Sequence, residues 1–218
     1  MANNFDKNWT TVNNNYPLND KEVERYISVK PSANQLALVD KPFYTFMHFG
    51  MNTATDREWG AGVEKATDFT IKSIDAKQWV ETAKSAGATG VILTCKHHDG
   101  FCLWPSEYTS FCVKNSSYKG DIVKEVSDEC HKQGMDFGVY LSPWDMHDER
   151  YGTDAYNDYF CNQLTELLTN YGEIFEVWFD GAKGSNAKKF EYDWQRYYDL
   201  IRKLQTKANI AICGPDIR

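Results

Sequence analysis

The stretch GVILTCKHHD, residues 90–99, joins a continuous apolar run to a cluster of polar side chains. An apolar run without alternation predicts a strand that is buried on both faces, as strands of parallel sheets are. His97, His98 and Asp99 follow at the point where this strand would end. In proteins built on parallel strands, the carboxyl ends of the strands carry the chemistry. The stretch therefore predicts an α/β fold with a functional site at this strand end.

The same unit recurs along the chain, with a helical pattern before each later strand. Apolar residues at helical spacing predict helices within residues 75–86, 122–130, 156–168 and 190–204. Apolar runs predict strands at residues 43–50, 90–95, 136–142, 174–180 and 209–213. Strands and helices alternate without a linker or a low-complexity break. A single parallel sheet covered by helices is therefore expected.

Each predicted strand ends in polar residues, and this favours one of two possible sheets. Doubly wound sheets and barrels both fit the alternation, but in barrels polar residues gather at the ends of many strands. His48, His97, Tyr140, Asp180 and Asp216 lie at or just after the five strand ends in turn. The pattern predicts a (β/α)8 TIM barrel. Such a barrel has eight strands in about 250 residues, so we expect the first five strands of a truncated or incomplete barrel.

Composition narrows the classes of function. The chain carries a formal net charge of −7, with Lys and Arg scattered. A nucleic-acid-binding surface needs a basic patch, so no nucleic acid partner is expected. No window approaches the roughly 18 apolar residues of a membrane span, so no membrane partner is expected. The polar start indicates a cytoplasmic protein if Met1 is native, or a secreted or cell-surface protein if a leader was removed.

Two clusters at the predicted rim indicate sugar recognition. The imidazoles of His97 and His98 can both donate to and accept from hydroxyls. Trp178, two residues before Asp180, could stack on the apolar face of a pyranose. Neighbouring residues of an extended chain point to opposite sides, so the two histidines are not expected to share a metal. The alternatives are structural: imidazoles bonded to loop backbone, an Asp that caps a turn, and a Trp packed in the barrel.

A third cluster, DREWG at residues 56–60, places Glu58 beside Trp59 after the first strand. A carboxylate next to an indole suits a sugar pocket, although a solvated loop would give the same pattern. Tyr140 fits a core position about as well as a ligand position. The six cysteines include no Cys-x-x-Cys pair, which argues against a thiolate zinc site. No metal or cofactor is expected.

Together these motifs resemble the α-L-fucosidases of glycoside hydrolase family 29. The matching segments run in order: HFGMNT (48–53), DREWG (56–60), HHDGF (97–101), GVYLSPW (138–144), VWFDG (177–181) and CGPDIR (213–218). The resemblance implies a fucosylated glycan as substrate and a retaining mechanism through a covalent fucosyl-enzyme intermediate, with Asp180 as the nucleophile. It also implies contacts to the fucose hydroxyls from His48, Glu58, Trp59, His97, His98, Tyr140, Trp178 and Arg218.

The resemblance also bears on linkage and on the proton donor. The Asn-Thr and Asp-x-Glu-Trp-Gly pieces look most like the subgroup that acts on α-1,3- and α-1,4-linked fucose. In that subgroup the acid/base Glu follows the Arg that matches Arg218, so it is expected in further C-terminal chain that completes the barrel. Glu58 is then a fucose ligand. Residues 1–30 are a polar lead-in, and residues 31–218 are the N-terminal part of the catalytic domain.

Two other functions stay open. A metal-dependent TIM-barrel hydrolase could use His48, His97, His98 and Asp180, although the His-x-His pair usual on the first strand of such proteins is missing. A fucose-binding module without turnover would also fit a chain without the acid/base group. Metal analysis tests the first of these functions, and hydrolysis of an activated aryl fucoside tests the second.

Overall fold

A computed structural model of the chain describes residues 19–41, 43–185 and 187–213. It contains a parallel sheet of five strands in the order β1-β2-β3-β4-β5. The strands are β1 (Thr45–Met47), β2 (Gly90–Lys96), β3 (Asp136–Leu141), β4 (Glu176–Asp180) and β5 (Asn209–Cys213). All five predicted strands are therefore confirmed.

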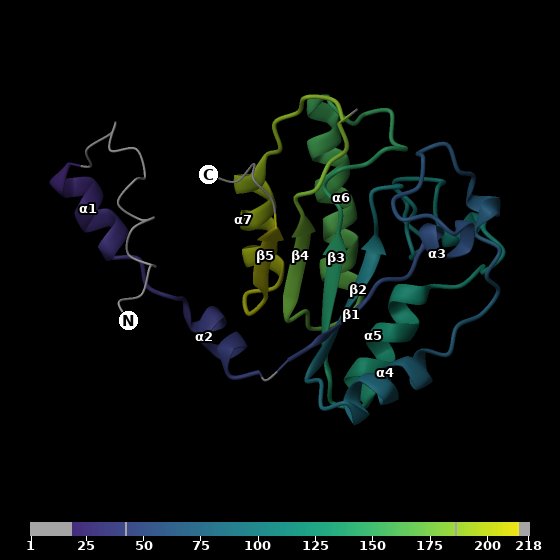
Figure 1. Cartoon of the computed structure of the whole chain (residues 1–218), viewed down its shortest axis with the longest axis horizontal. Coiled ribbons are helices and arrows are strands. Elements are labelled where there is room, and N and C mark those ends of the chain that lie inside the picture. The colour runs from purple at the N-terminus through teal and green to yellow at the C-terminus, as the bar shows by residue number, and fades with distance from the viewer. Residues whose placement is uncertain (1–18, 42, 186, 214–218) are drawn as a thin grey trace, which may run out of the picture.

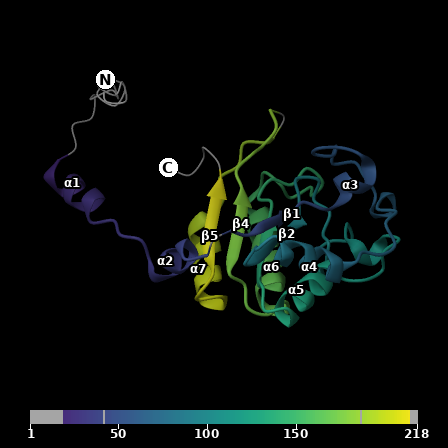
Figure 2. The same ribbon diagram turned by 60° about the horizontal axis from the view of Figure 1, so that its bottom comes forward.

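The strand order follows the chain order, and this identifies the architecture. Right-handed connections to the next strand place every helix on the same face of the sheet. The helices α4 (Ala76–Ser85), α5 (Ile122–Lys132), α6 (Asp154–Asn170) and α7 (Trp194–Leu204) cover that one face (Figure 1 and Figure 2). A doubly wound sheet instead reverses its strand order and carries helices on both faces. The chain thus contains five strands of a (β/α)8 barrel.

The main core fills the space between the sheet and its helices. β2 is buried along its whole length, and Val126, Leu164 and Ile201 from the helices are fully buried in the same cluster. The other face of the sheet, which is the barrel interior, carries a smaller cluster. Tyr140 is buried in it and Trp178 packs against it. Both rings come from positions that lead to the carboxyl ends of their strands, where the candidate site lies.

The helix ends show which local signals decided the boundaries. Asp75 caps α4 by accepting a hydrogen bond of 2.9 Å from the Gln78 backbone N–H, as expected. α7 begins later than predicted, because Asp193 caps it through the backbone N–H of Arg196 at 3.2 Å. Phe190 lies before the helix and packs against aromatic rings at the start of α6, among them Tyr156. Its match to the helical spacing was coincidental.

Two short helices precede the sheet. α1 (Asp20–Ile27) lies within the polar lead-in and apart from the sheet (Figure 1). α2 (Ala33–Val39) docks beside the start of β5, where Asn34 donates a hydrogen bond of 2.9 Å to the carbonyl of Thr206. Among the described residues, no helix is long and apolar enough to cross a membrane.

Candidate active site

A cavity of about 390 Å³ opens at the carboxyl ends of β1, β2 and β4. Strand ends that are far apart in sequence meet here, together with the short helix α3 (Met51–Thr55) and the loop that follows it. The cavity is lined by His48, Asn52, Thr53, Arg57, Glu58, Trp59, His97 and Asp180. Five of the predicted site residues are in this list. An acid, imidazoles and an indole that converge on one hollow mark it as the candidate active site.

Asp180 is the last residue of β4 and is held in one orientation. Its Oδ2 accepts a hydrogen bond of 2.8 Å from the phenol of Tyr140 on the neighbouring strand β3. Its Oδ1 accepts one of 2.8 Å from the backbone N–H of Ala182. The side chain is 16% exposed, so the carboxylate borders the cavity while its donors lie behind it. Such a fixed anion suits attack on an electrophilic carbon.

His98 lies between Asp180 and the loop after β3. Its Nε2 is 3.6 Å from Oδ2 of Asp180, and its Nδ1 is 2.6 Å from Oγ of Ser142. Burial lowers the pKa of His98 to about 4, although the Asp180 carboxylate acts in the opposite direction. The imidazole is therefore neutral near pH 7, and it can accept or donate a hydrogen bond there.

His97, the neighbour of His98 in the chain, is also buried. Its Nδ1 lies 3.1 Å from the side-chain nitrogen of Asn52. Its ring packs edge-on against His48, with centroids 4.7 Å apart, and stacks near Tyr140 at 5.7 Å. Burial, followed by the two neighbouring histidines, lowers the pKa of His97 to about 3. Both imidazoles of the pair are thus neutral hydrogen-bonding groups.

The expectation that His97 and His98 diverge is wrong. The backbone N–H of Gly100 bonds to the carbonyl of His97 at 3.0 Å, which closes a tight turn, and the rings lie 4.2 Å apart. One potential ligand atom from each of His97, His98 and Asp180 lies within 4.8 Å of the others. Two neutral imidazoles and a carboxylate are a common zinc ligand set. These three side chains are therefore candidate ligands for a metal ion.

The loop after α3 forms one wall of the cavity. Trp59, 37% exposed, packs edge-on against His98 and Trp144, with centroid distances of 5.3 and 5.5 Å. The loop rests on the segment after β3 at Gly62, where φ is +75° and a Cβ would come within 2.6 Å of the carbonyl oxygen of Met146. Glycine is required there. Glu58 has an exposed side chain, and its backbone carbonyl accepts a hydrogen bond of 2.9 Å from Asn52.

Tyr140 and Trp178 lie below Asp180, towards the barrel interior. Their rings stack with centroids 5.2 Å apart and an angle of 16°, and Phe46 packs edge-on against Trp178 at 5.2 Å. One face of Trp178 is thus occupied by Tyr140. A sugar contact from this indole would use its remaining face or its edge.

One predicted residue and four unpredicted ones have not yet been placed. Arg218 lies outside the described residues. Four site residues were not predicted: Asn52, Thr53 and Arg57 line the cavity, and Ser142 contacts His98. Asn52 and Ser142 fall inside the motifs HFGMNT and GVYLSPW. Their place in those motifs was one signal, and Ser142 also stands at the end of the third predicted strand, at the predicted rim.

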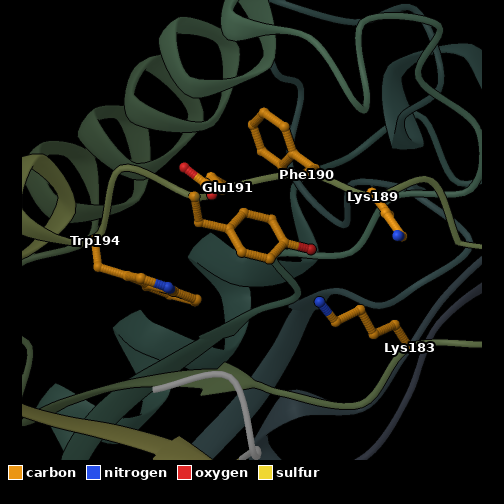
Figure 3. Close-up of a pocket in the computed structure, with 6 residues that line it drawn as sticks. Lys183, Lys189, Phe190, Glu191 and Trp194 are labelled. Atoms are coloured by element: carbon orange, nitrogen blue, oxygen red, sulfur yellow. The ribbon is translucent and has the colours of Figure 1, made fainter. Parts of the chain in front are cut away.

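A larger hollow of about 640 Å³ lies in the loop between β4 and α7 (Figure 3). Lys183 and Lys189 extend into it from two sides, and Trp194 lies along another side. Its described lining contains one acid, Glu191, and no imidazole. Volume alone does not identify a catalytic site, and the convergence of Asp180 with the histidines favours the smaller cavity.

Comparisons with known proteins find relatives that match most of the chain. The family model described as Alpha-L-fucosidase matches residues 44–214. Alpha-L-fucosidase 1 of Arabidopsis thaliana is 49% identical over 193 residues, which cover 86% of this chain and 38% of that protein.

Two solved structures share the fold. A glycoside hydrolase 29 family member from an unknown rumen bacterium is 49% identical with a TM-score of 0.80, over 83% of this chain and 35% of that one. A Ruminococcus gnavus GH29 fucosidase in complex with fucose is 38% identical with a TM-score of 0.78, over 85% of this chain and 43% of that one. The chain thus spans less than half the length of each of these three relatives.

Proposed function

The chain belongs to the α-L-fucosidase family, glycoside hydrolase family 29, and from this premise we propose that it supplies the nucleophile and most of the fucose pocket of a hydrolase that releases L-fucose from glycans. The cavity supports a sugar as the ligand. It offers imidazoles and a carboxylate for hydroxyls, and the Trp59 indole for the C–H face of a sugar ring.

Asp180 is the nucleophile in this proposal. Its carboxylate forms a bond to C1 of fucose while the bond from C1 to the leaving oxygen breaks and that oxygen takes a proton. Water then attacks C1, releases Asp180 and returns a proton to the acid/base group, so the configuration at C1 is retained. The observation that carries the proposal is the carboxylate itself, held by Tyr140 and Ala182 at the edge of the cavity.

The proton donor is a second carboxyl group, which retaining glycosidases place about 5–5.5 Å from the nucleophile. Glu58 is the other acid that lines the cavity. We assign Glu58 to fucose binding and the acid/base role to a Glu that follows Arg218 in the family's order of motifs. Glu58→Gln should then raise KM more than it lowers kcat. A loss on natural glycans that disappears with activated aryl fucosides would instead give Glu58 the acid/base role.

The other predicted residues bind fucose in this proposal. His48 and His97 line the cavity, His98 faces Asp180, and Tyr140 acts through its hydrogen bond to the nucleophile. Trp178 and Arg218 keep the roles that the family resemblance gives them.

The linkage is proposed to be α-1,3 or α-1,4, as in branched Lewis-type glycans. The support is local: Asn52 and Thr53 line the cavity together with Glu58 and Trp59, and these are the residues that look most like that subgroup. The test is kcat/KM of the intact protein on Lewis-type trisaccharides and on α-1,2-linked fucosides. Equal rates on both classes would contradict the assignment.

Trapping the covalent intermediate tests the reaction directly. A 2-deoxy-2-fluoro-fucosyl fluoride should inactivate the intact protein and leave one fluorofucosyl unit on the peptide that contains Asp180, as shown by mass spectrometry. The corresponding fluoroglucosyl fluoride is the control and should leave the protein unlabelled. Labelling of another residue would move the nucleophile, and turnover without any trapped intermediate would argue against a retaining mechanism.

A further inference from the structure

We propose that Ser142 and Asn52 hold His98 and His97 in opposite tautomers, so that the fucose pocket presents one fixed acceptor and one fixed donor to sugar hydroxyls. The inference rests on the proposed function and deepens it, since it names the two positioning residues that set the hydrogen-bond polarity of the pocket. Four side chains carry it, and all four are buried.

The hydroxyl of Ser142 has a single proton, and the chemistry of its two neighbours assigns that proton. Oγ of Ser142 donates to the carbonyl oxygen of Trp144 at 2.7 Å. The same Oγ lies 2.6 Å from Nδ1 of His98. A hydroxyl that has given its proton to a carbonyl can only accept from a second neighbour. His98 must therefore carry its proton on Nδ1, and its Nε2 is left with a lone pair.

Asn52 imposes the reverse arrangement on His97. The side-chain nitrogen of Asn52 lies 2.9 Å from the carbonyl oxygen of Glu58. Flipping the amide would place two acceptor oxygens against each other, so the NH2 group must face Glu58. The same nitrogen lies 3.1 Å from Nδ1 of His97 and has a second proton to donate there. Nδ1 of His97 therefore accepts, and the ring proton sits on Nε2.

The two tautomers give the pocket a defined polarity. Nε2 of His98 is an acceptor that lies 3.6 Å from Oδ2 of Asp180, itself an acceptor. Two acceptors at this separation favour a ligand that brings O–H protons between them. Nε2 of His97 is a donor on the neighbouring ring, whose centroid is 4.2 Å away. A pyranose hydroxyl can accept a hydrogen bond from Nε2 of His97 and donate one to Nε2 of His98. An ether or a carboxylate cannot donate, so it leaves His98 unpaired.

The chemical class that follows is a sugar with free hydroxyl groups at the positions that meet His98 and His97. Methylation or removal of the hydroxyl that faces His98 should weaken binding, because a buried acceptor then loses its donor. Ser142 is fully buried, whereas Asn52 also lines the cavity. They act through the imidazoles that they orient.

Nitrogen NMR of the intact protein tests the tautomers without relying on activity. In protein labelled with ¹⁵N-histidine and kept at neutral pH, His98 should show the Nδ1–H form and His97 the Nε2–H form. His131 is an internal reference, since its Nε2 lies 3.2 Å from the carbonyl of Glu173 and must donate. Ser142→Ala should shift His98 towards the Nε2–H form, whereas Ser142→Thr, which keeps the hydroxyl, should not. An Nε2–H form of His98 in the wild-type protein would overturn the proposal.

A panel of monodeoxy aryl fucosides links the tautomers to recognition. Ser142→Ala should lower kcat/KM on the parent aryl fucoside by about tenfold or more. One monodeoxy substrate should react equally with wild type and Ser142→Ala, because it lacks the hydroxyl that His98 binds. Equal losses across the whole panel would mean that Ser142 is merely structural and would overturn the inference. If wild type hydrolyses no fucoside, the proposed function fails, while the NMR result still decides the tautomers.

Discussion

The phenol of Tyr140 donates a hydrogen bond of 2.8 Å to Oδ2 of Asp180, across two neighbouring parallel strands. Tyr140 is buried, and both burial and the Asp180 carboxylate raise its pKa far above the ordinary value of 10. The phenol therefore stays protonated and remains a donor at every pH at which the protein is folded. The proposed nucleophile thus has a permanent hydrogen-bond partner on its own side of the cavity.

Tyr140→Phe should lower kcat by about 10- to 100-fold, because a hydrogen bond to a charged group contributes about 1.5–3 kcal/mol. Tyr171→Phe is a matched control. Tyr171 is also buried and also donates to a carboxylate, that of Asp121, at 2.9 Å, but far from the cavity. The Tyr171→Phe substitution should lower the free energy of unfolding and leave kcat unchanged. Steady-state kinetics on an aryl fucoside and urea unfolding of both variants separate the two effects.

Asp180→Gly should reduce turnover of the intact protein by several orders of magnitude, because a covalent nucleophile has no substitute within the site. The fold should survive, since the side chain borders the cavity and contributes little packing. Added azide should partly restore release of the aryl group and give a fucosyl azide of inverted configuration. Activity close to wild type would remove Asp180 from the mechanism.

Chelation decides between the glycosidase and the metal-dependent rival. One potential ligand atom from each of His97, His98 and Asp180 lies within 4.8 Å of the others, so removal of metal ions is the direct test. We expect that prolonged treatment with a chelator leaves kcat/KM unchanged, since the proposed reaction needs only carboxyl groups. Elemental analysis of the purified protein is the second measurement. Loss of activity that zinc restores would favour the metal-dependent hydrolase.

The buried ion pair of Lys96 and Asp145 should dominate the stability of the loop after β3. Nζ of Lys96 lies 2.9 Å from Oδ2 of Asp145, and the two side chains are 0% and 1% exposed. Lys96→Met leaves a buried carboxylate without its partner, which costs about 3–5 kcal/mol. Lys124→Met, which breaks the exposed pair with Asp128, should cost much less, because water screens that pair. Urea unfolding compares the two, and equal losses would contradict the expectation.

The strands could be predicted from the sequence because a strand that is buried on both faces is a continuous apolar run. β2 and β3 need apolar or small residues at nearly every position, so the runs stand out against polar loops. Helix boundaries were less accurate. Phe190 fits the helical spacing, yet it packs on α6 before α7 begins. Tertiary contacts of this kind leave no periodic signal in the chain.

In the candidate site, too, some residues could be predicted from the strand pattern, whereas others depend on tertiary contacts. Residues at strand ends, such as His48 and Asp180, were predictable because the fold itself places them at one rim. The proximity of His97 and His98 was not, since it depends on the turn closed by Gly100. Ser142 and Asn52 contact these histidines across 44 and 45 residues of sequence. Contacts of that range are set by the register of the strands, which a single sequence does not display.

Glu176 provides a pH-dependent test of the barrel interior. Its side chain is buried, its Oε2 has no hydrogen-bond partner among the described residues, and Oε1 accepts a long hydrogen bond of 3.4 Å from Tyr44. Burial raises the pKa of Glu176 from 4.5 to about 7, and the Tyr44 hydrogen bond offsets this only in part. Tyr44 is the one ionisable side chain that perturbs it within the described part of the chain.

The sign of the effect follows from proton release. Between pH 4.5 and about 7 the unfolded chain has lost the Glu176 proton, whereas the folded protein still holds it. Unfolding then releases a proton, so this residue's contribution to stability falls as pH rises, by at most about 1.4 kcal/mol per pH unit. Glu176→Gln removes this pH-dependent contribution to the free energy of unfolding. The free energy of unfolding of the variant minus that of wild type should therefore increase from pH 5 to pH 7 and then level off.

Urea unfolding of the intact protein at pH 5, 6, 7 and 8 measures this difference. Glu125→Gln is a matched control, because Glu125 accepts a hydrogen bond of 2.7 Å from Tyr118 at the exposed surface. The comparison separates the effect of the buried position from the general effect of replacing a glutamate. A difference for Glu176→Gln that stays constant or decreases with pH would show that Glu176 is already ionised in the folded protein at pH 5. The barrel interior would then have to supply it with a positive or hydrogen-bonding partner from outside the described residues.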